Sequence, residues 1–295
     1  MSIEQNRITR RKRKKIAKFK KLRKIFGLVG FIFDVDTTES GGSTSTQFQL
    51  PLSGAGTTNI LVDWGDGSTD TITSTSASEK LHTYSTGGTY TIKITGTLET
   101  FLINNYADKA KIKTIKNWGN GNGLTLASNS GGFFYGASNL TCIAADKPAI
   151  TSNNFQQLFR SAPRIVSGVS KFNVSSVTSL LFAFYSATRF NENLSSWDVS
   201  NVTQFNYCFE RTSVDQNFAA WDMTSATSVR RMFKSTTLST ANYDATLIGW
   251  AAQNVNSSLD INFGNAKYTG SGAAANARTY LIEEKSWTIT DGGAV

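Results

Sequence analysis

The chain has 295 residues and a net charge of +9, and only 17% of its residues are charged. It contains one histidine, His82, and two cysteines, Cys142 and Cys208, which form no CxxC pair. The composition therefore excludes a cysteine-rich zinc module and leaves a single candidate for a histidine base. We expect no cofactor and no disulfide, with Cys208 filling apolar space in the core.

The positive charge is concentrated in residues 1–28, which hold twelve Lys or Arg and one acid, whereas the rest of the chain has a balance of −2. Blocks of like charge repel internally and usually dock on an acidic partner. Apolar residues recur among the charges at helical spacing, as at Ile16, Phe19 and Leu22. We therefore predict an anchoring arm. Its residues are Arg10, Arg11, Lys12, Arg13, Lys14, Lys15, Lys18, Phe19, Lys20, Lys21, Leu22, Arg23 and Lys24.

Four interpretations of this arm are open: a signal peptide, a membrane-surface helix, a nucleic-acid contact and a docking arm for a larger protein assembly. The apolar run at 25–33 is too short for a membrane span, which needs about 20 residues. No small-x-small cleavage site follows that run. We favour the docking arm, and we interpret FIFDVDT at 31–37 as the first strand of the next domain.

The segment after the arm has the pattern of short antiparallel strands. LVDWGDGSTDTIT at 61–73 predicts a strand, an Asp-Gly turn and a second strand. Farther on, Gly87-Gly88 marks a turn before a strand in which Tyr90, Ile92 and Ile94 share one face. With FIFDVDT and STQFQLPL before these runs and LETFLINN after them, about six or seven strands fit the segment, which predicts a small β-sandwich.

The runs VDWGDGS and HTYSTGGTYTIKITG resemble the signature of the PKD (polycystic-kidney-disease) domain, over residues 31 to about 106. The resemblance implies an immunoglobulin-like β-sandwich that acts as a spacer or adhesive module without catalytic residues. It implies structural roles for Asp63, Asp66 and His82. Some members bind calcium, so Asp63, Asp66 and Asp70 are weak calcium candidates. We expect turn capping by Asp66 and a hydrogen bond from His82 to a neighbouring loop instead.

The second half of the chain repeats a motif every 24 or 25 residues. Its phenylalanines lie in short runs such as LFAFYSA and NYCFERT, and they are Phe134, Phe159, Phe184, Phe209 and Phe233. FNENLSSWDVSNVT and VDQNFAAWDMTSAT place Trp197 and Trp221 at equivalent positions. Self-similarity at this period predicts a solenoid whose units stack and share one core. We expect these phenylalanines and tryptophans to lie in that core.

LSSWDVSNVTQFNYCF is similar to the pattern of the BspA-type leucine-rich repeats, and the closing stretch resembles the segment that follows such repeats. In that stretch AAANARTYLIEE predicts a helix and SWTITDGG a last strand. The predicted fold is mainly β. It consists of the arm at 1–28, a PKD-like, immunoglobulin-like sandwich at 29–106, a leucine-rich-repeat-type solenoid at 107–255 and a small α/β cap at 256–295. We expect little interface between sandwich and solenoid beyond the junction at 117–123.

Two sets of side chains in the repeats are candidates for function. Tyr135, Tyr185 and Tyr207 are predicted to lie on a surface face that binds a sugar or a protein. Asp198 and Asp222 recur one repeat apart, about 5 Å from each other if the units stack in parallel, and this separation suits a retaining glycosidase. A carboxylate repeated in every unit is more commonly a turn residue. We therefore predict no catalytic residues, no metal site and no enzymatic activity.

PKD-like and BspA-type modules occur together in proteins of two kinds, tailed-phage virion proteins and bacterial surface proteins. Because a basic arm stands where a cleavable leader would, we expect a non-enzymatic virion protein. It would be a decoration, fibre or host-contact module that binds other virion proteins through the arm and a host glycan or protein through the solenoid. Nucleic acid is a less favoured partner, and the oligomeric state is left open. The alternatives are a bacterial cell-surface adhesin and, less favoured, a glycan-degrading enzyme.

Overall fold

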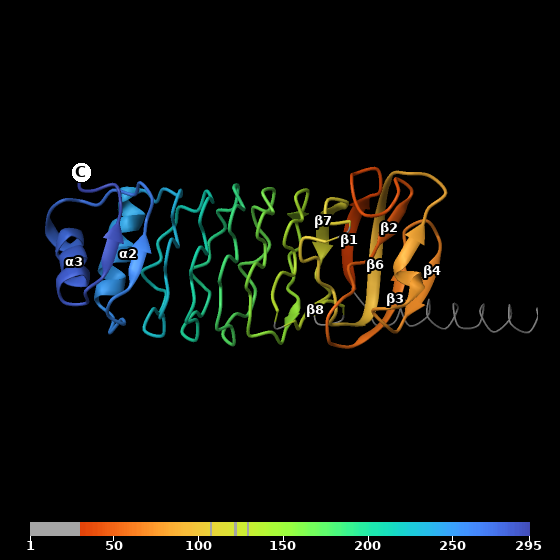
Figure 1. Cartoon of the computed structure of the whole chain (residues 1–295), viewed down its shortest axis with the longest axis horizontal. Helices are drawn as coiled ribbons and strands as arrows, with labels where there is room; N and C mark the ends of the chain where they lie inside the picture. The colour runs from red at the N-terminus through yellow and green to blue at the C-terminus, as the bar shows by residue number, and fades with distance from the viewer. Residues whose placement is uncertain (1–29, 107, 121–122, 129) are drawn as a thin grey trace, which may run out of the picture.

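The computed structural model describes residues 30–106, 108–120, 123–128 and 130–295. The predicted arm at 1–28 lies outside the described residues. The described part is mainly β and carries two α-helices near its C-terminal end. It is elongated, with a sheet at one end, a stack of irregular coils in the middle and the helices at the other end (Figure 1).

Six strands form the main sheet, in the order β4-β3-β6-β1-β7-β9. In chain order they are β1 (Phe31–Asp36), β3 (Thr58–Asp63), β4 (Thr69–Ile72), β6 (Thr89–Leu98), β7 (Ile112–Asn117) and β9 (Thr141–Cys142). β1 is antiparallel to both β6 and β7, and Phe33 lies opposite Ile92 and Ile115. β9 runs parallel to β7. Because successive side chains of a strand point to opposite faces, FIFDVD buries every second residue in the core.

A second, antiparallel pair consists of β2 (Gln47–Gln49) and β5 (Leu81–Thr83), with the short 3-10 helix η1 (Ser78–Lys80) before β5. The strand prediction for LETFLINN is wrong, since beyond the end of β6 this segment forms only an isolated bridge between Leu52 and Phe101. Its backbone leaves the sheet, and the Ile103 amide donates to the Phe133 carbonyl at 3.0 Å. The other predicted strands of this region are confirmed.

The expected small interface between the two predicted domains is wrong. β7 and β9 follow residue 107 but belong to the same sheet as β1. The rings of Phe101 and Phe134 lie 6.0 Å apart, on either side of the predicted boundary. A single apolar cluster extends from Phe31 to Trp287. The domain boundaries stay a prediction, but the sheet and the coils share one core.

The coils repeat the same backbone hydrogen bond. The amide of each core phenylalanine donates to the residue just before the next one, as from Phe159 to Ala183 at 2.7 Å and from Phe184 to Cys208 at 2.9 Å. The phenylalanine rings stack in a column with centroid separations of 5.1, 6.0, 5.5 and 5.6 Å. All five are fully buried, which confirms the prediction. Phe263 continues the column, 5.3 Å from Phe233. Cys208, also predicted to be buried, lies fully inside the core.

A second column consists of tryptophans. Trp197 and Trp221 are 3% and 1% exposed, which confirms that they lie in the core. Each indole N–H donates to a backbone carbonyl of the preceding coil. The bonds run from Trp197 to Val169 at 3.2 Å, from Trp221 to Leu194 at 3.0 Å, from Trp250 to Phe218 at 2.9 Å and from Trp287 to Asn256 at 2.8 Å. These tryptophans therefore link successive coils by hydrogen bonds.

Two helices close the C-terminal end, α2 (Thr240–Ala251) and α3 (Gly272–Glu283), with the parallel strands β11 (Asp260–Asn262) and β12 (Thr288–Thr290). α3 and β12 confirm the predicted helix and last strand. α2 was not predicted, and it begins before residue 256, where the cap was expected to start. A further short parallel pair joins β8 (Thr125–Leu126) and β10 (Ala149–Ile150) at the start of the stack.

Candidate functional site: a tyrosine–arginine ladder

Each coil forms a tight loop around its core phenylalanine, and two positions of that loop have left-handed backbone. The residue two places before the phenylalanine has a positive φ, at Gly132 (76°), Gln157 (59°), Phe182 (56°), Tyr207 (59°) and Arg231 (56°). The residue two places after it does too, at Gly136 (81°), Ser161 (54°), Ser186 (57°), Arg211 (61°) and Ser235 (58°). The reversal at both positions accompanies a loop in which the phenylalanine and the residue before it point inward.

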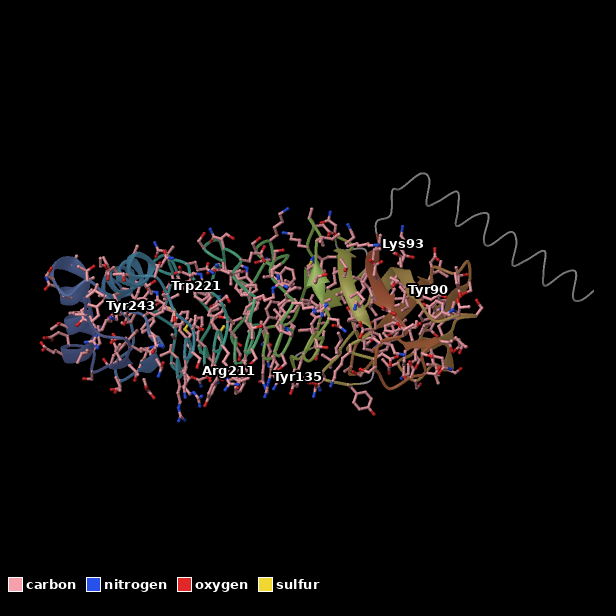
Figure 2. The ribbon with its side chains drawn as sticks, turned by 90° about the horizontal axis from the view of Figure 1, so that it is seen from above. Tyr90, Lys93, Tyr135, Arg211, Trp221 and Tyr243 are labelled. Carbon is pink, nitrogen blue, oxygen red and sulfur yellow. The ribbon has the colours of Figure 1, made fainter. Side chains whose placement is uncertain are left out.

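Stacking of the coils aligns these neighbours in rows, because equivalent residues of adjacent rungs lie about 5 Å apart. The row that follows the core phenylalanines consists of Tyr135, Arg160, Tyr185, Glu210 and Lys234. We define the ladder as Tyr135, Arg160, Phe182, Tyr185, Tyr207, Glu210 and Arg231. Figure 2 shows Tyr135 and Arg211 on the same long edge of the molecule.

The first half of the ladder is organised around Arg160. Its guanidinium carbon lies 4.9 Å from the ring centroid of Tyr135 and 4.9 Å from that of Phe182. The Tyr185 ring is 5.5 Å away. A guanidinium over aromatic faces is held by the ring quadrupoles. Arg160 therefore fills the space between the rings of the coil before it and those of the coil after it.

The stack continues through the second half. The rings of Phe182 and Tyr207 are 4.5 Å apart and nearly parallel, at 11°. The Arg231 guanidinium lies 5.2 Å from the Tyr207 ring. Phe182 and Tyr207 thus have a ring or a guanidinium group on both sides, and the rings of Tyr135 and Tyr185 each contact Arg160. The hydroxyl groups of the tyrosines make no hydrogen bond with the described residues and lie at the surface.

Three buried polar atoms of the ladder have no hydrogen-bond partner within the protein: Arg160 Nε, Arg231 Nε and Glu210 Oε2. In the part of the chain that the structure describes, these are all the side-chain atoms of this kind. Glu210 is 1% exposed, and its Oε1 accepts from Arg231 Nη2 at 2.7 Å. Each buried, unpaired polar group costs about 1–3 kcal/mol. Their concentration in one row marks the ladder as a site with a role other than packing.

Positive charge gathers at the end of the ladder that is nearer the cap. Arg211 and Arg230 are exposed, and Arg231 and Lys234 are half-buried. Together with Arg160 they make five basic groups, whereas the ladder contains one carboxylate, that of Glu210. Among the described residues, Arg231 is the member of this group that has an ion-pair partner. We call Arg211, Arg230, Arg231 and Lys234 the basic end.

The three predicted surface tyrosines, Tyr135, Tyr185 and Tyr207, are half-buried and all belong to the ladder. They meet through Arg160 and Phe182, which the sequence argument did not single out. It also missed Glu210 and the basic end. Arg160, Phe182, Glu210 and the basic end all lie within three residues of a repeat phenylalanine, and this spacing is the sequence signal that would have found them.

The weak calcium candidates Asp63, Asp66 and Asp70 accept hydrogen bonds from other groups of the protein. Asp66 Oδ1 accepts from the amide and hydroxyl of Ser68 at 2.9 and 2.6 Å, which is the expected turn cap. Asp70 Oδ2 accepts from the Trp64 indole at 2.9 Å, and Asp63 Oδ1 from the Gly65 amide at 3.2 Å. No group of three or more metal-ligating His, Cys, Asp or Glu side chains occurs among the described residues.

His82 contacts both a serine and a carboxylate, but through the same ring nitrogen. Its Nε2 lies 2.9 Å from Asp66 Oδ2 and 3.5 Å from Ser68 Oγ. A Ser-His-Asp relay needs the carboxylate on the ring nitrogen opposite the serine. The ring also stacks on Trp64 at 4.6 Å. The arrangement closes a turn and has no nucleophile–base geometry.

The repeated carboxylates Asp198 and Asp222 also cap turns. Asp198 Oδ1 accepts from the Ser200 amide and hydroxyl at 3.1 and 2.6 Å, and these bonds lower the pKa of Asp198. Asp222 makes the same pair of bonds with Thr224 at 2.9 and 2.7 Å. Asn173, one coil earlier, caps Ser175 in the same way. A turn needed in every coil explains the repetition.

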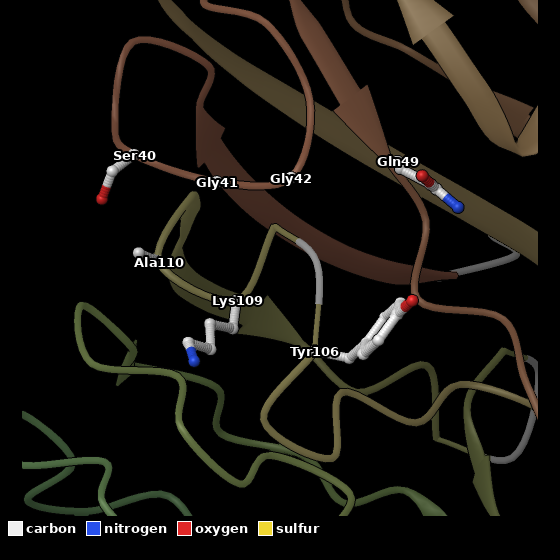
Figure 3. Close-up of a pocket in the computed structure, with 7 residues that line it drawn as sticks. All are labelled: Ser40, Gly41, Gly42, Gln49, Tyr106, Lys109 and Ala110. Carbon is white, nitrogen blue, oxygen red and sulfur yellow. The ribbon is translucent and has the colours of Figure 1, made fainter.

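A cavity of about 560 Å³ lies at the edge of the sheet region, beside the end of β2. Gln49, Tyr106 and Lys109 are among its lining residues, and the side chains of Tyr106 and Lys109 point apart (Figure 3). The Lys109 ammonium donates to Asn105 Oδ1 at 2.7 Å. The cavity therefore lacks the convergent polar groups that define a small-molecule site.

Comparison with known proteins found a match between part of the chain and a family model. The family described as "Mycoplasma protein of unknown function, DUF285" matches residues 153–272. The matched segment contains four of the five repeat phenylalanines, most of the ladder and α2. No curated protein and no solved structure matches the chain. Within the described residues, no helix combines the length and apolar character needed to cross a membrane.

Proposed function

We propose that the protein is a non-enzymatic structural protein of a phage virion that displays the ladder as a binding surface. The observation that carries this proposal is the ladder itself. It collects all of the unpaired buried polar side-chain atoms of the described residues on one edge of an elongated stack. A surface of this kind is suited to binding a partner and not to catalysing a reaction.

The finer fold belongs to the same proposal. We propose that the sheet region is a PKD-like, immunoglobulin-like sandwich, supported by the antiparallel β2–β5 pair and by the turn that Asp66 caps. We propose that the coils form a BspA-type leucine-rich-repeat solenoid, supported by parallel bridges one coil apart, as from Ser179 to Gln204 and on to Ser228. α2 and α3 would form its α/β cap.

The absence of catalysis rests on how the candidate carboxylates are used. Asp198 and Asp222 are exposed turn caps, and each is bonded to its own turn. Asp66 and Ser68 contact the same ring nitrogen of His82, which is unsuited to a relay. A glycan-degrading activity would require free carboxylates on both sides of a substrate cleft. The described residues support a binding role instead.

Anchoring through the N-terminal arm completes the proposal. The arm carries twelve basic residues and one acid. This charge would attach it to an acidic surface of the other virion proteins, and nucleic acid is the less favoured partner. The ladder lies in the coils, so that it stays available when the arm is docked. Its proposed partner is a glycan or protein of the host surface.

The second candidate is a bacterial cell-surface adhesin. One observation favours it, namely that the matching family is described as a protein of Mycoplasma, a bacterium. Mass spectrometry of purified phage particles and of bacterial envelope fractions separates the two candidates. We expect peptides of this chain in the particles. Peptides found only in the envelope would replace the virion proposal with the adhesin.

A further inference from the structure

We infer that the ladder binds an acidic polysaccharide, a chain of carboxylate-bearing sugars that lies along the stack of coils. This inference rests on the proposed display function and specifies the partner of its surface. Three properties of the ladder lead to it: the central rings have partners on both sides, the charge is positive, and one buried acceptor needs a donor.

The first property argues against recognition by stacking. Binding of bases or of sugar faces on aromatic platforms requires free ring faces. Here Arg160 lies 4.9 Å from both the Tyr135 and the Phe182 centroids, and Phe182 is stacked on Tyr207 at 4.5 Å. What the ladder presents outward is a row of phenol hydroxyls and guanidinium N–H groups. These groups recognise hydroxyls and anions by hydrogen bonding.

The second property selects an anionic partner. Arg160 and the basic end supply five cationic groups, whereas the ladder has the single carboxylate of Glu210. Guanidinium groups form short, charge-assisted and often bidentate bonds with carboxylates. Arg160 belongs to the second coil and the basic end to the fourth and fifth coils, so at about 5 Å per rung the cations span roughly 15 Å of the stack. An extended polyanion matches this arrangement better than a single small ion does.

The third property selects a polymer that also carries hydroxyl groups. Glu210 Oε2 and the Nε atoms of Arg160 and Arg231 have no partner within the protein. The two Nε atoms need acceptors, which any anion supplies. Glu210 Oε2 needs a donor, and the backbone of duplex DNA offers none. A sugar acid has hydroxyl donors and a carboxylate acceptor in one residue, so it can serve both kinds of atom when the Arg231 side chain shifts.

The backbone of the ladder supports the same role. A left-handed backbone favours glycine, and Gly132 occupies the position in the first coil. The next coils have Gln157, Phe182, Tyr207 and Arg231 there, although such a conformation costs about 1–2 kcal/mol for a residue with a Cβ. These side chains are retained at a cost to stability. Strain of this kind gathers at binding sites.

The test measures binding of the whole chain to polygalacturonate, with neutral dextran of matched length and single-stranded DNA of matched charge as comparison polymers. Arg231→Gln should weaken binding to polygalacturonate roughly 10- to 100-fold, the loss of one charge-assisted bond. Tyr207→Phe keeps the ring stack and removes one hydroxyl, so a loss of a few-fold is expected. Saturating polygalacturonate should also raise the midpoint of thermal unfolding, since a ligand of the folded state stabilises it.

Lys93→Gln is the matched control for charge. Lys93 lies on the edge of the molecule opposite Tyr135 and Arg211 in Figure 2. Its replacement should change binding by less than about two-fold, because exposed charges are screened beyond about 8 Å at physiological ionic strength. Circular dichroism and unfolding midpoints of each variant show that the fold is intact.

Three outcomes would overturn the inference. The first is equal binding of dextran and polygalacturonate, and the second is an equal loss for Arg231→Gln and Lys93→Gln. The third is tighter binding of the DNA, which would assign the ladder to nucleic acid. None of these results bears on whether the protein is part of a virion, because mass spectrometry of particles tests that proposal separately. Conversely, the protein could be absent from particles and still bind polygalacturonate through Arg231. That result would support the polysaccharide inference and refute only the proposal that the protein belongs to a virion.

Discussion

Single residues in the coils combine apolar burial with one polar bond to a neighbour. Trp197 illustrates this, since its ring is 3% exposed and its indole N–H donates to the Val169 carbonyl at 3.2 Å. The ring fills the shared core, and the bond gives a backbone carbonyl of the preceding coil a second donor, beside the Phe172 amide. Trp221 does the same with Leu194 at 3.0 Å. Such a residue determines both the packing and the register of two coils.

Replacing Trp197 separates the two contributions. Trp197→Ala should lower the free energy of unfolding by about 3–5 kcal/mol, because it leaves a large cavity in the core. Trp197→Phe keeps most of the ring and removes one bond to the Val169 carbonyl, which still accepts from the Phe172 amide at 2.9 Å, so a smaller loss of about 0.5–1.5 kcal/mol is expected. Urea unfolding monitored by circular dichroism measures both. Equal losses for the two variants would mean that ring volume contributes little.

Acid stability depends on Asp66. Burial raises the pKa of Asp66, but hydrogen bonds from Ser68 and His82 outweigh it and lower the pKa from 3.8 to about 2. A carboxylate whose pKa is lowered on folding stabilises the protein above its unfolded pKa. This contribution is lost as the pH falls from about 4 through about 2. Asp66→Asn should therefore be less stable than wild type at pH 6, and the difference should shrink toward pH 2.

Urea unfolding of both proteins between pH 6 and pH 2 measures this dependence. Glu79→Gln, which changes an exposed carboxylate outside the turn, is the matched control. A stability difference between wild type and Asp66→Asn that stays constant over this range would show that the turn acts through packing alone.

At the scale of elements, the tight loop around each core phenylalanine is the repeating structural unit. Ser186 follows Phe184 by two places and has a φ of 57°. Its amide donates to the Glu210 carbonyl at 2.9 Å and so joins two coils. The conformation is required by the loop, and a small side chain tolerates it.

Substitution at Ser186 tests the requirement. Ser186→Val should lower the free energy of unfolding by about 1–3 kcal/mol, because a β-branched residue is strained in left-handed backbone. Ser186→Gly relieves that strain, and its effect should stay within about 1 kcal/mol. Thermal unfolding of the pair provides the comparison. Similar stabilities for Val and Gly would contradict the assigned backbone.

The cap is the other decisive element. α2 is joined to the preceding coil by Asp215, whose Oδ1 accepts from the Ser239 amide at 2.8 Å and from Asn242 at 2.8 Å. Trp250 of α2 donates to the Phe218 carbonyl at 2.9 Å. The helix thus covers rings that the last coil would otherwise expose. It belongs to the cap by its contacts, although it begins before residue 256.

At the scale of the whole molecule, sheet and stack behave as one body with one core. The described core begins at Phe31, just beyond the arm. Deleting residues 1–28 should therefore leave the unfolding midpoint of the rest nearly unchanged. The same deletion should abolish incorporation into particles, and attachment of the full chain should weaken with rising salt because the arm acts through charge.

Differential scanning calorimetry and particle co-sedimentation measure the two halves of this prediction. A charge-neutral arm, with its arginines and lysines changed to glutamine, separates charge from length. Normal incorporation of the truncated chain would refute the anchoring role. If the isolated arm bound duplex DNA but not particles, we would instead place the arm inside the capsid, facing the genome.

The sequence by itself determined the features that follow from local period. Recurrence of phenylalanine every 24 or 25 residues predicted a stacked core, since identical units can bury identical faces only against each other. Alternation in FIFDVD and the Asp-Gly turn at Asp66 predicted β1, β3 and β4 for the same local reason. Tyr135 and Tyr185 follow a repeat phenylalanine by one place and Tyr207 precedes one by two, so all three are visible in the sequence beside the repeat.

Only the tertiary structure decided what depends on contacts between distant segments. It placed β7 beside β1, and it brought Arg160 between Tyr135 and Phe182. It also buried Lys111, whose ammonium donates to the Thr44 and Gln47 carbonyls at 2.7 and 2.8 Å. A lysine in sequence reads as a surface charge, because its burial depends on oxygens supplied by a loop more than sixty residues away. The ladder belongs to the same class, since its unpaired atoms become visible only when five coils are stacked.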